Sequence, residues 1–356
     1  MFLFYRHFKK TDVNGIKIII IFTFYSKAAA NTMANPEKEP AYLSMQKDDQ
    51  LSDRASAARL LLAACNLCPH RCGVNRLQGE TGLCRIESKA RVASFGPHFG
   101  EEQPLVGSSG SGAIFFEGCN LGCVFCQNVD ISHIDDPGDE APGAVTREQL
   151  AEIMLELQTR GCLNINLVTP SHVVPQILEA LELAVGLGLH LPLVYNSSGY
   201  DSVQTLQLLD GIVDIYMPDC KFMTRESAAR YTGAPDYPEV MQAAVREMHR
   251  QVGNLVLDEN GIALRGLLVR HLVMPGCLGD TEKIVRFLAT EISKETYVNI
   301  MDQYHPCHRA GEFDEINRPL SLTEYEQAME LARQAGLYRF DVKDVSRMLK
   351  LMLQNQ

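Results

Sequence analysis

The sequence has no excess of basic residues and no apolar run long enough to cross a membrane. Its 33 Lys and Arg stand against 44 Asp and Glu, so the 356-residue chain carries a formal charge of -11 and repels the phosphate backbone of nucleic acids. The apolar run at residues 18–22 is far shorter than the roughly 20 residues that span a bilayer. With 46% hydrophobic and 22% charged residues, the composition is that of a globular protein. We expect one or two domains, no nucleic-acid partner and no membrane contact.

Cysteine is abundant, whereas tryptophan is absent: the chain has 11 Cys and no Trp. The number of cysteines is odd, and most of them are clustered, unlike the dispersed and even set of a disulfide framework. Metal ligation is therefore the first interpretation.

From Gly112 onward, short apolar or β-branched runs alternate with helical patterns. Buried parallel strands read as continuous apolar runs, and residues 191–195 and 266–270 mostly do. Thr146 and Gln149 form a capping box at the start of a helix. Six strand–helix units of this kind predict an α/β fold, a full or partial barrel. The expected strands are 112–116, 164–169, 191–196, 212–218, 266–274 and 296–301, and the expected helices begin at 147 and cover 173–186, 202–209, 238–252 and 281–292.

Two further helices are expected after Pro319, packed outside the barrel as a C-terminal cap. Thr323 and Glu326 suggest a capping box for the first, and the second would begin at about Lys343.

Three cysteines, Cys119, Cys123 and Cys126, follow the first barrel strand directly. Gly118 and Gly122 give the backbone freedom to fold three thiolates around one centre. Structural zinc prefers four protein ligands, whereas a 4Fe-4S cluster held by three leaves one iron open for an exogenous ligand. Barrel enzymes also place their chemistry in the loops at this end of the strands. The spacing therefore favours an iron–sulfur site.

This Cys-x3-Cys-x2-Cys motif resembles that of the radical S-adenosylmethionine (SAM) superfamily, which carries it after the first strand of a partial barrel. Within the superfamily the chain is most similar to the activating enzymes of glycyl-radical enzymes such as pyruvate formate-lyase, in particular to an uncharacterised branch of activase homologues. The resemblance covers roughly residues 110–305 and rests on the stretches 118–128, 214–221 and 269–276.

The resemblance implies a partial (β/α)6 TIM-like barrel of the radical SAM type, with a 4Fe-4S cluster on Cys119, Cys123 and Cys126. SAM would be cleaved reductively to a 5′-deoxyadenosyl radical that abstracts hydrogen from a substrate. Reduced flavodoxin or ferredoxin would donate the electron. The hydrogen donor would be a glycine of a partner protein or a small molecule, and the sequence does not name it.

The resemblance also places candidate SAM ligands at the strand ends. Many relatives hold the SAM amino group with Gly-Gly-Glu after the second strand, but here that stretch reads Thr-Pro-Ser-His over residues 169–172, whose hydroxyls and a carbonyl can accept hydrogen bonds. Helix capping by Ser198 and a plain ion pair between Asp219 and Lys221 are the structural alternatives. The predicted cofactor-binding residues are Phe125, Thr169, Ser171, His172, Asn196, Ser198 and Arg270, and the predicted catalytic residues are Asp219 and Lys221.

A second cluster, Cys65, Cys68, Cys72 and Cys84, lies upstream of the barrel. Four cysteines that begin with Cys-x2-Cys suit a closed tetrahedral site. We consider a second metal here: structural zinc, a rubredoxin-like iron or an auxiliary iron–sulfur cluster. The alternative is four unligated thiols.

The first 32 residues combine basic residues, a short apolar run and small residues, which is similar to a secretory signal. A start codon assigned too early, with Met33 or Met45 the true start, or a frayed extension is favoured, because an oxidising compartment would oxidise a thiolate-rich iron protein. We therefore expect a cytoplasmic protein. The expected domains are a disordered or misassigned extension at 1–60, a four-cysteine knuckle at 61–100, the barrel at 101–310 and a helical cap at 311–356.

The contrasting functional class is a non-catalytic iron–sulfur or zinc protein with a structural or electron-transfer role. SAM would perturb the reduced cluster of an enzyme and leave that of an electron carrier unchanged.

Overall fold

The computed structural model describes residues 7–13, 16–22, 39–134 and 138–341. The chain divides into two units, residues 1–36 and 37–356. Within the first unit, β1 (His7–Val13) and β2 (Ile16–Phe22) pair antiparallel.

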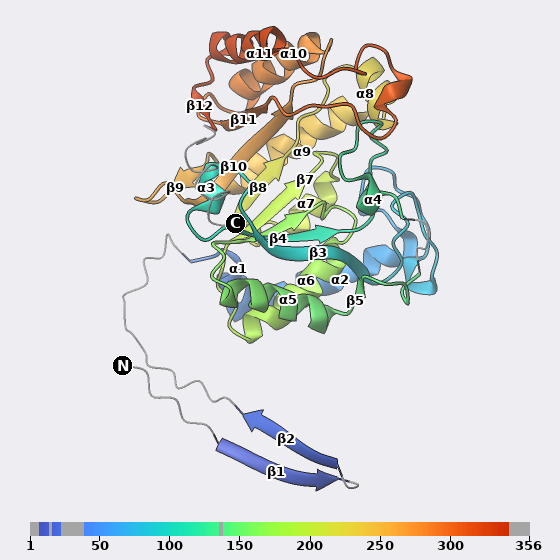
Figure 1. Ribbon diagram of the computed structural model, residues 1–356, viewed down its shortest axis with the longest axis vertical. Coiled ribbons are helices and arrows are strands. Elements are labelled where there is room, and N and C mark those ends of the chain that lie inside the picture. Colours follow the sequence, from blue (N-terminus) through green and yellow to red (C-terminus); the bar gives the residue numbers. More distant parts are fainter. Residues whose placement is uncertain (1–6, 14–15, 23–38, 135–137, 342–356) are drawn as a thin grey trace. The chain divides into compact units, whose positions relative to one another are not determined.

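The second unit is built on one mostly parallel sheet (Figure 1). Its strands follow the order β12-β11-β10-β8-β7-β6-β4-β3-β5, with β9 paired to β10. Neighbours from β4 to β12 run parallel, and β3, β5 and β9 pair antiparallel. Parallel strands in chain order form the partial barrel that the sequence predicts. The strands are β3 (Ala90–His98), β4 (Ser111–Phe116), β5 (Ala144–Val145), β6 (Ile165–Val168), β7 (Leu193–Ser197), β8 (Ile215–Pro218), β9 (Val256–Leu257), β10 (Ala263–Leu272), β11 (Tyr297–Met301) and β12 (Arg339–Phe340).

Helices precede the sheet, link its strands and follow it. The α-helices are α1 (Tyr42–Lys47), α2 (Gln50–Leu60), α3 (Gln103–Val106), α4 (Val129–Ser132), α5 (Arg147–Thr159), α6 (Val174–Gly186), α7 (Val203–Leu208), α8 (Arg225–Thr232), α9 (Tyr237–Val252), α10 (Leu278–Phe287) and α11 (Leu322–Ala335). Short 3-10 turns are η2 (Leu61–Ala64), η3 (Arg76–Gln78) and η5 (Ala310–Glu312), and η4 (Leu288–Ile292) is a π-helical turn. None of the helices in the described segments has the length and apolarity needed to cross a bilayer.

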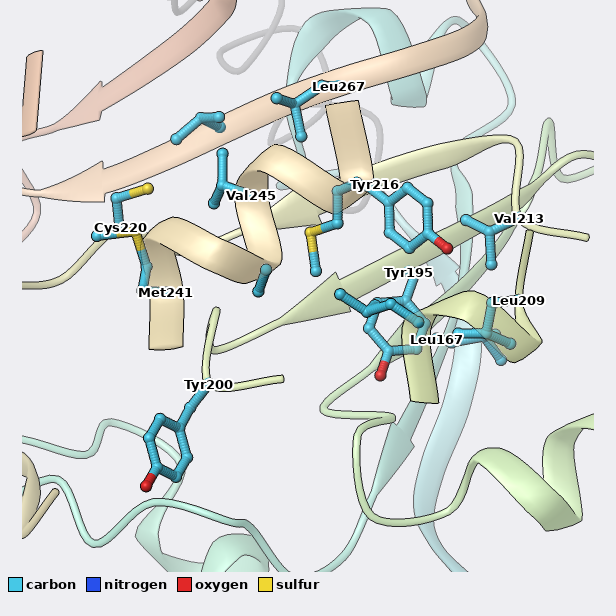
Figure 2. Close-up of a cluster of buried hydrophobic side chains, with 14 of the residues drawn as sticks. Leu167, Tyr195, Tyr200, Leu209, Val213, Tyr216, Cys220, Met241, Val245 and Leu267 are labelled. Atoms are coloured by element: carbon cyan, nitrogen blue, oxygen red, sulfur yellow. The ribbon is translucent and has the colours of Figure 1, made fainter. Parts of the chain in front are cut away.

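The core lies between the sheet and the helices packed on it. Figure 2 shows Met241 and Val245 of α9 in one buried cluster with Tyr216 of β8 and Leu267 of β10. The Tyr195 and Tyr216 rings meet edge to face, with their centroids 5.6 Å apart. Apolar side chains on both strands and helix exclude water here, which is the main favourable term in folding.

Two helix starts test the capping boxes expected from the sequence. The Thr146 hydroxyl accepts a hydrogen bond from the Gln149 backbone amide, and the Gln149 side-chain oxygen accepts one from the Thr146 backbone amide. The capping box at the start of α5 is therefore confirmed. The box at α11 joins Ser321 and Glu324; the expected Thr323–Glu326 pair was wrong, because the chain enters the helix two residues earlier. The second C-terminal helix, expected from Lys343, lies outside the described residues.

Residues 42–47 and 50–60 are helical, so disorder, one of the two readings of the extension at 1–60, was wrong for these residues. Leu51, Ala55 and Ala58 of α2 are buried at helical spacing, and α2 packs on α6. Tyr42 of α1 is fully buried, and its hydroxyl donates to the Leu191 carbonyl over 2.7 Å. Because two of the three buried residues of α2 are alanines, the buried face of this helix does not stand out as a hydrophobic stripe in the sequence.

Candidate active site

One cavity of about 190 Å³ opens at the carboxyl ends of the parallel strands. It is lined from the loop after β4 and from the ends of β6, β7, β8, β10 and β11. In parallel α/β sheets this edge is where ligands bind. Ten of the predicted site residues line it together: Cys119, Cys123, Phe125, Cys126, Thr169, Asn196, Ser198, Asp219, Lys221 and Arg270.

The three cysteines belong to a loop fixed by backbone hydrogen bonds to distant segments. The amides of Gly122 and Val124 donate to the carbonyls of Thr232 and Tyr231 at the end of α8, over 3.1 and 2.9 Å. The Arg309 amide donates to the Val124 carbonyl over 2.8 Å. The loop is thus held on two sides, which presents its thiols to the cavity in a fixed arrangement.

Burial governs the protonation of these thiols. Cys119 and Cys123 are partly buried, and what remains exposed lines the cavity. Burial raises the pKa of Cys119 to about 11 and that of Cys123 to about 12, although the Lys221 ammonium opposes the shift at Cys123. Both thiols are therefore neutral at pH 7 until a metal displaces their protons.

Charged groups at the ends of β8 and β10 form a network in the same cavity. The Lys221 ammonium lies 2.5 Å from Asp219 Oδ2, and Arg270 Nε lies 3.2 Å from Asp219 Oδ1. Burial alone would raise the pKa of Asp219, but Lys221 and Arg270 outweigh it and hold that pKa below its ordinary value. Asp219 is therefore a carboxylate near neutral pH.

Arg270 also pairs with two acidic residues that sequence reasoning missed. Its Nη1 lies 3.4 Å from Glu101 Oε2, and its Nε lies 3.9 Å from Glu102 Oε1. Glu102 is buried and accepts from the Asn299 amide over 2.8 Å. These glutamates precede α3, outside the strand–helix units, and their adjacency in the sequence was the one available signal. Arg270 thus reaches the cavity already paired with carboxylates.

Ser171 and His172 do not line this cavity, which corrects their expected place beside SAM. Thr169 has φ +60°, and this left-handed residue, followed by Pro170, turns the chain away as β6 ends. Ser171 is buried beside Asp201. His172 Nε2 hydrogen-bonds the Glu117 carbonyl over 2.8 Å, and burial lowers its pKa to about 4.

The second cysteine cluster borders a separate small cavity of about 10 Å³. It is lined by all four of its cysteines, together with His70, Arg76, Asn120 and His172. Burial raises the pKa of Cys68 to about 12, and the neighbouring thiols of Cys84, Cys72 and Cys65 add to this. The four cysteines of the knuckle thus border one cavity, although no three His, Cys, Asp or Glu side chains of the described residues are placed to hold a single metal ion.

No protein-family model matches the sequence. A curated relative, the uncharacterized protein MJ0674 of Methanocaldococcus jannaschii, is 35% identical over 296 residues, which cover 82% of this chain and 80% of the relative. The chain belongs to the family of MJ0674. The name of this relative assigns no activity to the family.

Two solved structures show weaker similarity, both at 12% identity. The structure of TYW1 with a lysine-pyruvate adduct matches 63% of this chain and 72% of its own, with a TM-score of 0.39. The structure of the cobalamin-dependent S-adenosylmethionine radical enzyme OxsB with aqua-cobalamin matches 67% of this chain and 35% of its own, with a TM-score of 0.34. At these scores neither structure indicates the activity of this chain.

Proposed function

We propose that the protein is a radical SAM enzyme that uses the cavity at the carboxyl ends of its parallel strands. The observation that carries the proposal is that Cys119, Cys123 and Cys126 line one cavity with the polar groups at the ends of β6, β7, β8 and β10. Bound to these thiolates, a 4Fe-4S cluster would supply the electron that cleaves SAM to methionine and a 5′-deoxyadenosyl radical.

The three cysteines that line this cavity offer the thiolate ligands of an iron–sulfur cluster. In the part of the chain that the structure describes, no three His, Cys, Asp or Glu side chains are arranged to hold one metal ion. Thiolate ligands also suit iron–sulfur clusters chemically.

The other cavity residues would bind and orient SAM. The Asn196 and Ser198 side chains line the cavity beside the left-handed Thr169, and they offer donors and acceptors to ribose or carboxylate oxygens. Phe125 lines the cavity with an apolar ring, which meets the Phe222 ring edge to face with the centroids 6.0 Å apart. Ligand pockets typically measure roughly 300–1,000 Å³, so we expect the 190 Å³ cavity to widen when SAM binds.

The electron would come from reduced flavodoxin or ferredoxin, and the hydrogen donor is a separate question. The resemblance of residues 118–128 and 214–221 to activating enzymes favours a glycine Cα–H of a partner protein.

Two observations favour the contrasting class, a metal protein without catalysis. Arg270 is engaged by Asp219, Glu101 and Glu102, and Ser171 and His172 turn away from the cavity, so fewer groups are free for SAM than the sequence predicts.

The test is 5′-deoxyadenosine formation after anaerobic reconstitution with iron and sulfide, reduction with dithionite and addition of SAM. We expect nucleoside from the wild type and from Cys162→Ala, a control that removes a buried thiol lining neither cavity. Cys123→Ala should form none. If the wild-type protein binds its cluster but forms no 5′-deoxyadenosine, the proposal of a radical SAM enzyme is refuted. The non-catalytic metal protein then becomes the supported function.

A further inference from the structure

The cavity beside Cys65, Cys68, Cys72 and Cys84 contains a buried cation that no carboxylate balances. The Arg76 side chain is only 1% exposed. Its Nε donates to the Glu87 carbonyl over 2.9 Å, and its Nη1 donates to the His172 carbonyl over 2.8 Å. Neither acceptor carries a charge, and among the described residues no Asp or Glu lies within ion-pair distance of the guanidinium.

Such a cation needs an anion, because arginine is not deprotonated in proteins and burying an uncompensated charge costs several kcal/mol. The nearest candidate anions are sulfurs: Arg76 Nη1 lies 4.0 Å from Cys65 Sγ. Arg76 Nη2 is buried without a hydrogen-bond partner, and so is His172 Nδ1 on the same cavity wall. A thiol is neutral, whereas a metal-bound thiolate is an anion.

We propose that Cys65, Cys68, Cys72 and Cys84 form a metal–thiolate centre whose negative charge is balanced by the buried Arg76 guanidinium. Each thiol loses one proton to solvent as its metal–sulfur bond forms. Zinc and an iron–sulfur cluster share this chemistry, since both carry a net negative charge with four thiolates. As the thiols stand, no three His, Cys, Asp or Glu side chains of the described residues could hold a single ion, so the thiols must draw together to bind zinc.

Gly82 leaves the room that Cys72 occupies. A Cβ at this position would lie 2.6 Å from Cys72 Sγ and 2.9 Å from its Cβ. The backbone of Gly82 is not left-handed, so alanine there would displace the cysteine without straining the main chain. This gives a substitution that acts on the proposed ligand set alone.

The centre would also hold the loop of the first cysteine cluster in place. His70 Nε2 hydrogen-bonds the Asn120 carbonyl over 2.8 Å. At Gly118, with φ +77°, an added Cβ would lie 2.5 Å from the Cys84 carbonyl oxygen. Metal binding at the knuckle therefore fixes two points of contact with the loop that carries Cys119.

The experiment uses the full chain with Cys119, Cys123 and Cys126 replaced by alanine, so that the knuckle alone can bind metal. One sample is titrated with zinc and another is reconstituted anaerobically with iron and sulfide; metal and acid-labile sulfide per chain are then measured. We expect either one zinc without sulfide, or about four irons with about four sulfides.

In the same background, Arg76→Met and Gly82→Ala should lose most of the metal, and Arg76→Lys should retain more than Arg76→Met because it keeps the charge. Gly186→Ala, which meets no atom within 4 Å, is the matched control. If iron is bound, the midpoint potential of Arg76→Met should be more negative than that of Arg76→Lys. A knuckle that binds neither metal would overturn the proposal, as would equal metal content in the Arg76→Met and Arg76→Lys proteins. The proposed radical chemistry does not enter these readouts.

Discussion

Asp214 should make the stability of the protein fall as the pH rises through the neutral range. The carboxylate precedes β8 and accepts from the Ala41 amide over 2.8 Å and from the Leu193 amide over 2.9 Å. Burial raises its pKa from 3.8 to about 7, against these two hydrogen bonds. Asp214 thereby links the segment before α1 to the start of β7. This link places an ionisable carboxyl group in the protein interior.

The sign follows from the two pKa values. Between pH 3.8 and 7 the folded protein keeps a proton that the unfolded chain has released, so the free energy of unfolding decreases as the pH rises and levels off above 7. At 1.36 kcal/mol per pH unit, the loss between pH 5.5 and 8 is about 2 kcal/mol. Asp214→Asn has no charge to bury and should lack this component.

The assay is urea unfolding of wild type and Asp214→Asn at several pH values from 5.5 to 8. As the pH rises across this range, the unfolding free energy of the wild type should fall by about 2 kcal/mol more than that of Asp214→Asn. Asp53→Asn, at an exposed position of α2, controls for exchanging a carboxylate for an amide. A difference between wild type and Asp214→Asn that stays constant over the pH range would refute the reasoning.

Three further substitutions test the strand ends around the cavity. Gly199→Ala places a Cβ 2.2 Å from the Asp219 carbonyl oxygen, so it should lower the urea midpoint more than Gly233→Ala, which has a similar positive φ but open space; equal midpoints would contradict the clash. Tyr237→Phe removes a hydroxyl 2.8 Å from the same carbonyl oxygen and should cost about 1–3 kcal/mol in unfolding free energy. Thr169 has φ +60°, and asparagine tolerates this left-handed backbone better than threonine does. Thr169→Asn should therefore stabilise the protein by about 1 kcal/mol and raise its melting temperature. A lowered melting temperature would show that Thr169 is not strained.

The strand–helix order could be predicted because burial on both faces of a parallel sheet leaves a direct mark in the sequence. β7 is buried along its whole length, and its run was assigned within two residues at each end. α8 was missed because its eight residues, of which Ala228, Tyr231 and Thr232 are buried, are too few to show a long apolar stripe. α2 was missed because alanine supplies most of its buried face.

The candidate site was predictable where residues sit at strand ends and not where the backbone leaves regular geometry. Asn196, Asp219 and Arg270 come to one cavity because parallel strands end at one edge of the sheet. The direction of Ser171 and His172 depends on a left-handed threonine, which the sequence does not signal because β-branched residues rarely adopt it. Burial of Arg76 was equally hidden, since arginine is seldom buried without a partner.

The two cysteine clusters are separate in the sequence and continuous in the structure. Gly118 packs so closely on the Cys84 carbonyl that no side chain fits between them. The Asn120 carbonyl hydrogen-bonds His70 of the knuckle. The side-chain amide of Asn120 donates to the Tyr200 carbonyl after β7. The loop that carries Cys119 is therefore positioned by the knuckle on one side and by the barrel on the other. Backbone hydrogen bonds order the knuckle, for example from the Cys65 amide to the Val74 carbonyl, and the metal–thiolate bonds that we propose would add to them. For this reason the state of the upstream cysteines should affect how precisely Cys119, Cys123 and Cys126 meet in the cavity.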